Sequence, residues 1–265
     1  MNPLFYLLFL QQGDANALFE QARQTVDPAR KVMLLEKSIA AGNSFAAQYA
    51  LGEAFRKLSN PERAETAFLE AIRITNDRKE LARASYRLGL ISEDRGSTPD
   101  AIAWMTVSNR YYPYPESAES LKKLELSRLD KVLSANQIVS ALSNVSRSAK
   151  TLAAVNVRIN FEFDSAQVEA EGARQLEELA NALNSAAFGN RGFRLVGHSD
   201  VRGGEEYNTN LSLRRAQAVA GVLAKRGVAK ERLATEGRGL REPLFTGNDE
   251  EDHRLNRRVE VQLVR

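Results

Sequence analysis

The spacing of apolar residues changes about halfway along this chain. From Asp14 to about Lys131 apolar residues recur every three or four positions, the spacing of amphipathic helices. From Val155 onward apolar and polar residues alternate, which is typical of a strand with one buried face. The alternating apolar residues are Val155, Val157, Ile159, Phe161 and Phe163. The sequence therefore predicts an all-α domain followed by a domain that contains a β-sheet, and 265 residues suit two domains of ordinary size.

Composition divides the chain into four segments. Residues 132–154 are rich in Ser, Ala, Asn and Val and are interpreted as a linker with a short helix. In that helix Ile138, Leu142 and Val145 would share one side. The predicted organisation is an apolar N-terminal segment (1–13), an all-α domain (14–131), the linker (132–154) and an α/β domain (155–265).

The N-terminal segment contains an apolar run, Pro3–Leu10, that is too short to cross a bilayer as a helix. Ala15, Asn16 and Ala17 fit an A-x-A cleavage pattern, although a signal peptide also has a basic n-region and only the terminal amine is available here. A truncated or mis-started signal and a packing helix are both retained as interpretations.

The helical half contains a repeat displaced by 37 residues. Small residues of the repeat would let the two helices of a hairpin approach closely: Gly52, Ala64, Gly89 and Ala101. Large residues would fill the space between hairpins: Leu51, Phe68, Leu88 and Met105. The pattern resembles the tetratricopeptide repeat, and residues 34–52 are similar to a Sel1-type repeat. The resemblance implies a surface for a protein partner, with a plain helical spacer as the alternative.

Composition argues against several kinds of site. The chain has no cysteine and two histidines, which excludes disulfides and thiolate metal sites and makes a zinc site improbable. Residues 1–150 carry a formal charge of +3 and residues 151–265 carry none, without the basic stripe of a nucleic-acid-binding protein. His198, Ser199 and Asp200 are adjacent on a strand and so cannot form a catalytic relay. We expect a protein that is not an enzyme and uses no cofactor.

The second half alternates strands and helices. Helices are predicted at about Glu169–Ala187 and Asn208–Arg226, with Gly227 closing the second. Strands are predicted at residues 192–198 and 232–237, and a fourth is predicted where Val259, Val261 and Leu263 alternate. This order predicts an α/β sandwich.

Two charges in this half have unusual positions. Asp200 follows the second predicted strand in a turn that Gly203 and Gly204 allow. Arg215 shares a helix face with Asn208 and Ser212, on the apolar side of the helix. Buried charges need partners, so the two either pair with each other or bind a ligand that carries both signs.

Five motifs occur in order: FEFDSA (161–166), GHSD (197–200), YNTNLSLRRA (207–216), TEGRG (235–239) and NRRVEVQL (256–263). Together they resemble the OmpA-like peptidoglycan-binding domain, over about 110 residues. The resemblance implies a mixed βαβαββ sheet and a groove for the diaminopimelate-containing peptide stem of peptidoglycan.

The resemblance implies a set of ligand-binding residues. The acid and the base of the family correspond to Asp200 and Arg215, and Arg257 is interpreted as a supporting residue. The full predicted set is Asp200, Arg215, Asn208, Phe163, Asp164, Ser199 and Arg257. Ser199 replaces the threonine that is usual in the family and keeps the hydroxyl. The acids of residues 248–255 are expected to lie in a solvated loop.

The function implied is non-catalytic binding of peptidoglycan, which would anchor a helical adaptor at the cell wall. The alternative is an assembly adaptor of a secretion or motility complex whose OmpA-like domain no longer binds peptidoglycan. Either function implies a periplasmic location, and association with the outer membrane is a further expectation.

Overall fold

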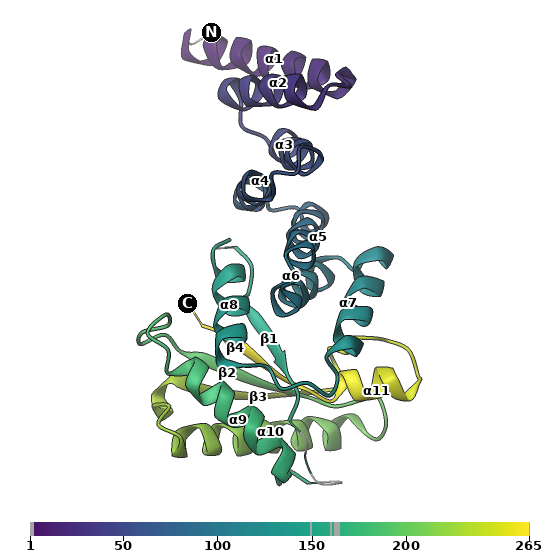
Figure 1. The fold of residues 1–265 in the computed structure, drawn as a ribbon, viewed down its shortest axis with the longest axis vertical. Helices are drawn as coiled ribbons and strands as arrows, with labels where there is room; N and C mark the ends of the chain where they lie inside the picture. The colour runs from purple at the N-terminus through teal and green to yellow at the C-terminus, as the bar shows by residue number, and fades with distance from the viewer. Residues whose placement is uncertain (1–2, 149, 160, 162–164, 265) are drawn as a thin grey trace.

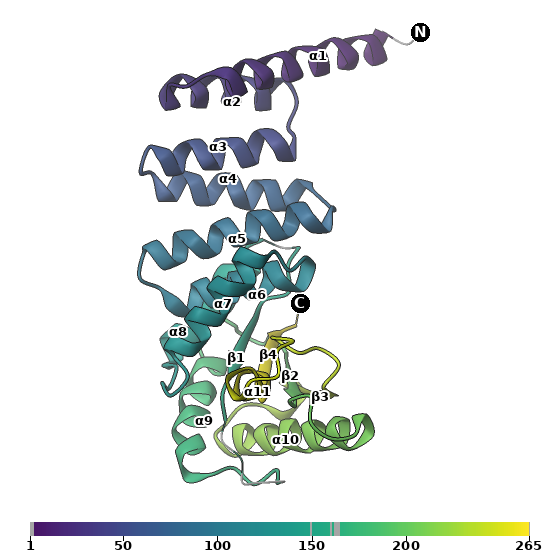
Figure 2. The same cartoon turned by 90° about the vertical axis from the view of Figure 1, so that its right-hand side faces the viewer.

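Helical hairpins stack on a mixed β-sheet in the computed structural model of this protein (Figures 1 and 2). The structure describes residues 3–148, 150–159, 161 and 165–264. Three hairpins form the stack, and two further helices lie beside the sheet. The helices of this half are α1 (Pro3–Gln24), α2 (Pro28–Ala41), α3 (Phe45–Lys57), α4 (Pro61–Ile74), α5 (Arg78–Asp94), α6 (Thr98–Tyr111), α7 (Pro115–Ser127) and α8 (Ala135–Ser146). Within the described ranges, the search for a helix long and apolar enough to cross a membrane finds none.

Glycines let two of the hairpins close tightly. A Cβ at Gly52 on α3 would lie 2.7 Å from the Phe68 ring on α4, and one at Gly89 on α5 would lie 2.8 Å from Met105 Cγ on α6. The repeat therefore places the same small-against-large contact in successive hairpins. Phe68 and Met105, which were expected to fill the space between hairpins, each pack against the glycine of their own hairpin.

The second half confirms the mixed α/β fold. Its elements are β1 (Ala154–Val157), α9 (Ala170–Leu183), β2 (Phe193–His198), α10 (Glu205–Lys225), β3 (Leu233–Gly239), α11 (Glu250–Asn256) and β4 (Val259–Leu263). The sheet order is β1-β4-β2-β3, in which β2 and β3 are parallel and β4 is antiparallel to both β1 and β2. The acidic stretch expected to be a solvated loop contains α11 instead. Its Asp252 is buried and lies 2.8 Å from Lys122 Nζ of α7.

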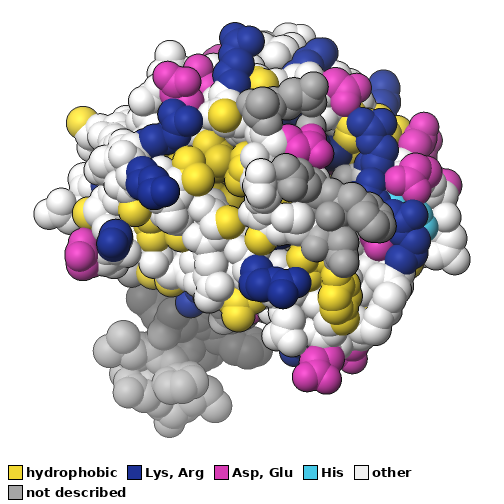
Figure 3. Space-filling view, turned by 90° about the horizontal axis from the view of Figure 1, so that it is seen from below, with side chains coloured by type: hydrophobic (Ala, Val, Ile, Leu, Met, Phe, Trp, Pro, Cys, Tyr) yellow, Lys and Arg dark blue, Asp and Glu magenta, His cyan; other side chains and the backbone are white. Residues whose placement is uncertain are grey.

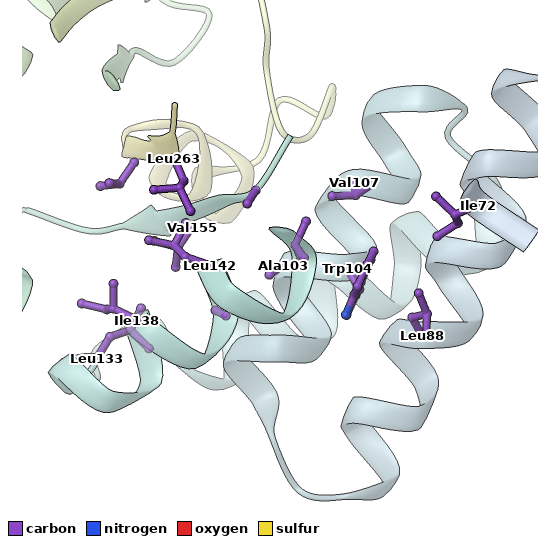
Figure 4. Packing of buried hydrophobic residues seen from close by; sticks show 14 of the residues in the cluster. Ile72, Leu88, Ala103, Trp104, Val107, Leu133, Ile138, Leu142, Val155 and Leu263 are labelled. Atoms are coloured by element: carbon purple, nitrogen blue, oxygen red, sulfur yellow. The ribbon is translucent and has the colours of Figure 1, made fainter. Parts of the chain in front are cut away.

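Both faces of β1 and β4 are buried. The apolar face packs with α8, α9 and α10 in a hydrophobic cluster that continues into the helical stack (Figure 4). On the opposite face the polar side chains Asn156, Glu260 and Gln262 are also buried. The predicted strand with one buried face is therefore corrected, because α6 and α7 of the helical half cover the second face with Arg110 and Glu125.

The segment interpreted as a linker is packed. It contains α8, whose Ile138, Leu142 and Val145 are buried against the same cluster. Ser148 and Thr151, which follow α8, are buried as well. The two halves are thus in direct contact, and the sheet relies on the helical half for part of its cover.

Candidate functional site

A cavity of about 350 Å³ opens where the two halves meet. Residues from the α7–α8 connection, the segment after β1, α9, β2, α10 and α11 contribute to it. The lining residues are Leu129, Asp130, Lys131, Val132, Arg158, Ile159, Phe161, Glu169, Gly172, Gln175, His198, Arg215, Arg254, Arg257 and Arg258. A concave site of this volume can hold a small ligand or a short peptide segment.

Basic side chains dominate the cavity lining, with six Lys or Arg and two acids. The two acids are Asp130 and Glu169, and Asp130 lies 3.0 Å from Arg254 at the exposed edge. Arg158 lies 3.2 Å from Glu125, which is buried and does not line the cavity. Cations in a partly enclosed site attract anions, because low-dielectric walls weaken solvent screening. The cavity therefore favours a ligand that carries negative charge.

The position of α10 follows from glycines in the sheet. A Cβ at Gly197 on β2 would lie 2.1 Å from the Ser212 carbonyl oxygen, and one at Gly237 on β3 would lie 2.5 Å from the Thr209 carbonyl oxygen. The Gly239 N–H also donates to Ser212 Oγ at 2.9 Å. The helix can rest directly on the strands because these positions have no side chain. Arg215, one turn beyond Ser212, is then directed to the cavity.

Asp200 lies at the end of β2 and is held by two arginines. Its Oδ2 lies 2.6 Å from both Arg202 Nη2 and Arg257 Nη1, and its Oδ1 accepts from the Arg202 N–H at 3.1 Å. Burial alone would raise its pKa, but these hydrogen bonds outweigh burial and lower the pKa to about 2. Asn208 fixes the same turn, since its Nδ2 donates to the Arg202 carbonyl at 2.7 Å. Asp200 is therefore a carboxylate at all ordinary pH values.

Arg215 extends from α10 toward the segment after β1. Its Nε donates to the Ser165 carbonyl at 3.0 Å, and its guanidinium lies 5.0 Å from the centre of the Phe161 ring. No ion pair joins Arg215 to Asp200, both of which the structure describes. The interpretation of a mutual structural pair is therefore not supported by the geometry.

Arg257 contacts both the cavity and Asp200. It lines the cavity and bridges Asp200 to Glu250, at 2.6 and 3.0 Å. Of the remaining predicted residues, Ser199 is buried next to β3, where its N–H donates to the Gly239 carbonyl at 3.0 Å. Phe163 and Asp164 lie outside the described residues. The structure thus brings Arg215 and Arg257 to the cavity, with Asp200 and Asn208 immediately behind Arg257.

Several cavity residues were not predicted from the sequence. Arg158 follows the polar side of the alternating pattern, Lys131 and Arg254 lie outside the five motifs, and Arg258 lies in the NRRVEVQL motif but is not in the predicted ligand-binding set. Arg254, Arg257 and Arg258 place three cations within five residues, which indicates either a solvent-exposed segment or a shared anion. This run is the signal in the sequence that could have identified these cavity residues.

His198 lies at the inner end of the cavity and is a neutral, buried imidazole. Burial lowers its pKa to about 4, with a further contribution from Arg258, while Glu260 acts in the opposite direction. Its Nε2 lies 3.7 Å from Glu260 Oε2, and Arg110 of α6 forms an ion pair with the same carboxylate. The group of charges beneath the cavity therefore joins the sheet to the helical half.

We expect the protein to lose stability in mild acid through His198. The folded pKa lies below the ordinary value of about 6.5, so the unfolded chain binds the proton first as pH falls. The stability that depends on neutral His198 is fully present above pH 6.5 and is lost as pH falls toward 4. The free energy of unfolding falls by about 3 kcal/mol over this range. Urea unfolding at pH 7 and pH 4 gives the fall in the free energy of unfolding for each protein. The fall should be smaller by about this amount in His198→Gln than in wild type. Equal drops in both proteins would contradict the assignment.

Charge on the outer surface is dispersed at the end of the molecule that carries α9 and α10. Figure 3 shows Lys and Arg side chains scattered across this face, with acidic side chains mainly toward its edge. A search for clusters of His, Cys, Asp and Glu that could hold a metal ion finds none among the described residues. Among the described residues, the basic cavity is therefore the candidate ligand site.

Residues 160–257 match the OmpA family. The peptidoglycan-associated lipoprotein of Pseudomonas putida is 42% identical over 102 residues, which are 38% of this chain and 60% of that protein. Outer membrane protein A of Bordetella avium is 35% identical over 104 residues, which are 39% of this chain and 53% of that protein. The chain therefore spans little more than half the length of these curated relatives.

Among solved structures, the peptidoglycan-associated lipoprotein from Burkholderia pseudomallei is similar to the same part of the chain. The identity is 30% and the TM-score is 0.37, over 40% of this chain and 88% of that one.

Proposed function

Because residues 160–257 form an OmpA family domain, we propose that this protein binds peptidoglycan without catalysis, through the cavity that Arg215 and Arg257 line. One observation carries the proposal. Two arginines from separate family motifs reach the same basic cavity, with Asp200 directly behind one of them. The names of the relatives, peptidoglycan-associated lipoprotein and outer membrane protein A, support the same ligand and a location in the cell envelope.

The proposed ligand is the peptide stem, recognised at its diaminopimelate residue. A stem offers several carboxylates, which suit the guanidinium groups of Arg215 and Arg257 because guanidinium and carboxylate can share two parallel hydrogen bonds. It also offers an ammonium group, which Asp200 would balance. Arg202 and Arg257 occupy Asp200 Oδ2, whereas Oδ1 accepts one hydrogen bond among the described residues, from the Arg202 N–H, and so has an acceptor position for the ligand.

The helical half is proposed to carry a protein partner to the wall. Its stacked hairpins α1–α6 extend from the sheet toward the N-terminus (Figure 2). Exposed rings and cations lie together on their surface, with Lys79 Nζ 5.0 Å from the centre of the Tyr112 ring. The protein would then act as an adaptor, held at peptidoglycan by one half and to its partner by the other.

The test is co-sedimentation of the full chain with purified peptidoglycan sacculi. We expect wild-type protein to pellet with the sacculi and to be released by excess soluble disaccharide-tetrapeptide. Asp200→Asn should bind at least tenfold more weakly, because the ligand ammonium loses its counter-charge.

A folded wild-type chain that stays in the supernatant would contradict the proposal. That result would favour the alternative of an assembly adaptor without a wall ligand.

A further inference from the structure

One wall of the cavity belongs to the helical half. Leu129, Asp130, Lys131 and Val132 form the connection between α7 and α8, and all four line the cavity. The family match begins at residue 160, so this wall lies outside it. The cavity is therefore a composite of the OmpA family domain and a segment that precedes it.

Helix α9 holds this wall in place. The Leu133 N–H donates to Gln175 Oε1 at 2.8 Å, and Gln175 Nε2 donates back to the Leu133 carbonyl at 3.1 Å. Glu178 accepts from the Ala135 N–H at 2.7 Å, at the first turn of α8. Gln175 is itself buried and lines the cavity. These hydrogen bonds fix the position of the α7–α8 connection relative to α9.

Helix α7 fixes the other end of the wall. Arg128, which directly precedes it, donates to the Asn156 carbonyl of β1 at 3.1 Å. Leu121 and Leu124 of α7 pack with Phe245 and with Leu255 of α11. Asp130 then lies 3.0 Å from Arg254, which is also on α11. The α7–α8 connection and α11 therefore pack together.

We propose that the α7–α8 connection completes the ligand site, and that Lys131 contacts a carboxylate of the peptide stem. This inference rests on the proposed function. Lys131 lines the cavity, is exposed at its mouth, and forms no ion pair with any carboxylate in the described part of the chain. Lys131 comes from the α7–α8 connection, Arg215 from α10 and Arg257 from the end of α11, so three separate segments supply cations to the cavity, which suits a ligand with separated negative charges.

The experiment measures the dissociation constant of the soluble disaccharide-tetrapeptide for the full-length chain by calorimetry. Lys131→Glu should raise the dissociation constant about tenfold at low salt, because it reverses a charge that faces the ligand. The difference should shrink in high salt, where exposed charges are screened. Lys131→Arg should bind like wild type. The matched control is Lys123→Glu on α7, which is exposed and does not line the cavity.

A second ligand tests whether the contact is to a carboxylate. With a stem whose carboxylates are amidated, the difference between wild type and Lys131→Glu should largely disappear. Persistence of the full tenfold difference with the amidated stem would contradict a direct contact.

The outcomes separate this inference from the proposed function. Wild-type binding with equal constants for Lys131→Glu and Lys123→Glu would overturn the composite site and leave the proposed function standing. Absence of binding by folded wild-type chain would overturn both. Thermal melts of each variant should match wild type, since Lys131 and Lys123 are exposed.

Discussion

Arg215→Ala is expected to weaken binding to sacculi by about 30-fold or more while the chain stays folded. Truncating one side of a charge-assisted contact costs about 2–5 kcal/mol, largely because the ligand carboxylate is left in a partly enclosed site without its partner. Among the described residues, Arg215 Nε donates to the Ser165 carbonyl, and the guanidinium lies near the Phe161 ring. Co-sedimentation and thermal melts on the same preparation measure the two effects separately.

Arg214→Ala is the matched control. It removes the same side chain from the neighbouring position of α10, which is exposed and does not line the cavity. We expect it to bind sacculi within about twofold of wild type. If Arg215→Ala lowers the melting temperature sharply and its folded fraction still binds, Arg215 is structural and the ligand assignment fails.

Glu125→Gln is expected to lower the free energy of unfolding of the full chain by about 3–5 kcal/mol. Glu125 of α7 is fully buried and lies 2.7 Å from Arg128 and 3.2 Å from Arg158, and it also accepts from Asn156. Burial would raise its pKa, but the two arginines outweigh burial and lower it. Glutamine leaves both guanidinium groups without a counter-charge, and removing one member of a buried ion pair has a cost of this size.

Urea unfolding gives the measurement, with Trp104 of α6 as a buried fluorescent reporter. Glu119→Gln is the control, because Glu119 is exposed on the same helix. Its effect should stay within about 0.5 kcal/mol. A loss for Glu125→Gln no larger than that of the control would show that the two halves do not depend on this charge cluster.

Local pattern was sufficient for most of the elements of the second half. The predicted strand around Val259 and Leu263 is β4, and the helix predicted at residues 208–226 is α10, whose end is marked by Gly227 at a φ of 91°. The structure adds three residues at the start of that helix. Such features follow from neighbours in the sequence, since alternation, helical spacing and glycine turns depend on residues a few positions apart.

Motif spacing also placed Arg215 correctly on the inner face of α10, and glycines explain why. The sequence marks Gly197, Gly237 and Gly239, and the structure shows that the helix rests on these positions. Motif spacing did not identify the partners of Asp200. Its neighbours Arg202 and Arg257 are two and 57 residues away, and only the folded chain brings the second one within 2.6 Å.

The sequence by itself determined the two-part organisation, the order of strands and helices apart from α11, and the family of the second half, because each depends on local periodicity or on motifs in order. The tertiary structure alone decided which polar residues are buried and which cations share the cavity. Asn156, Arg158 and Glu260 follow the pattern of a solvated strand face, yet α6 and α7 cover them with complementary charges. A side chain's environment is set by segments far away in the chain, so periodicity indicates which residues share a face but not what covers that face.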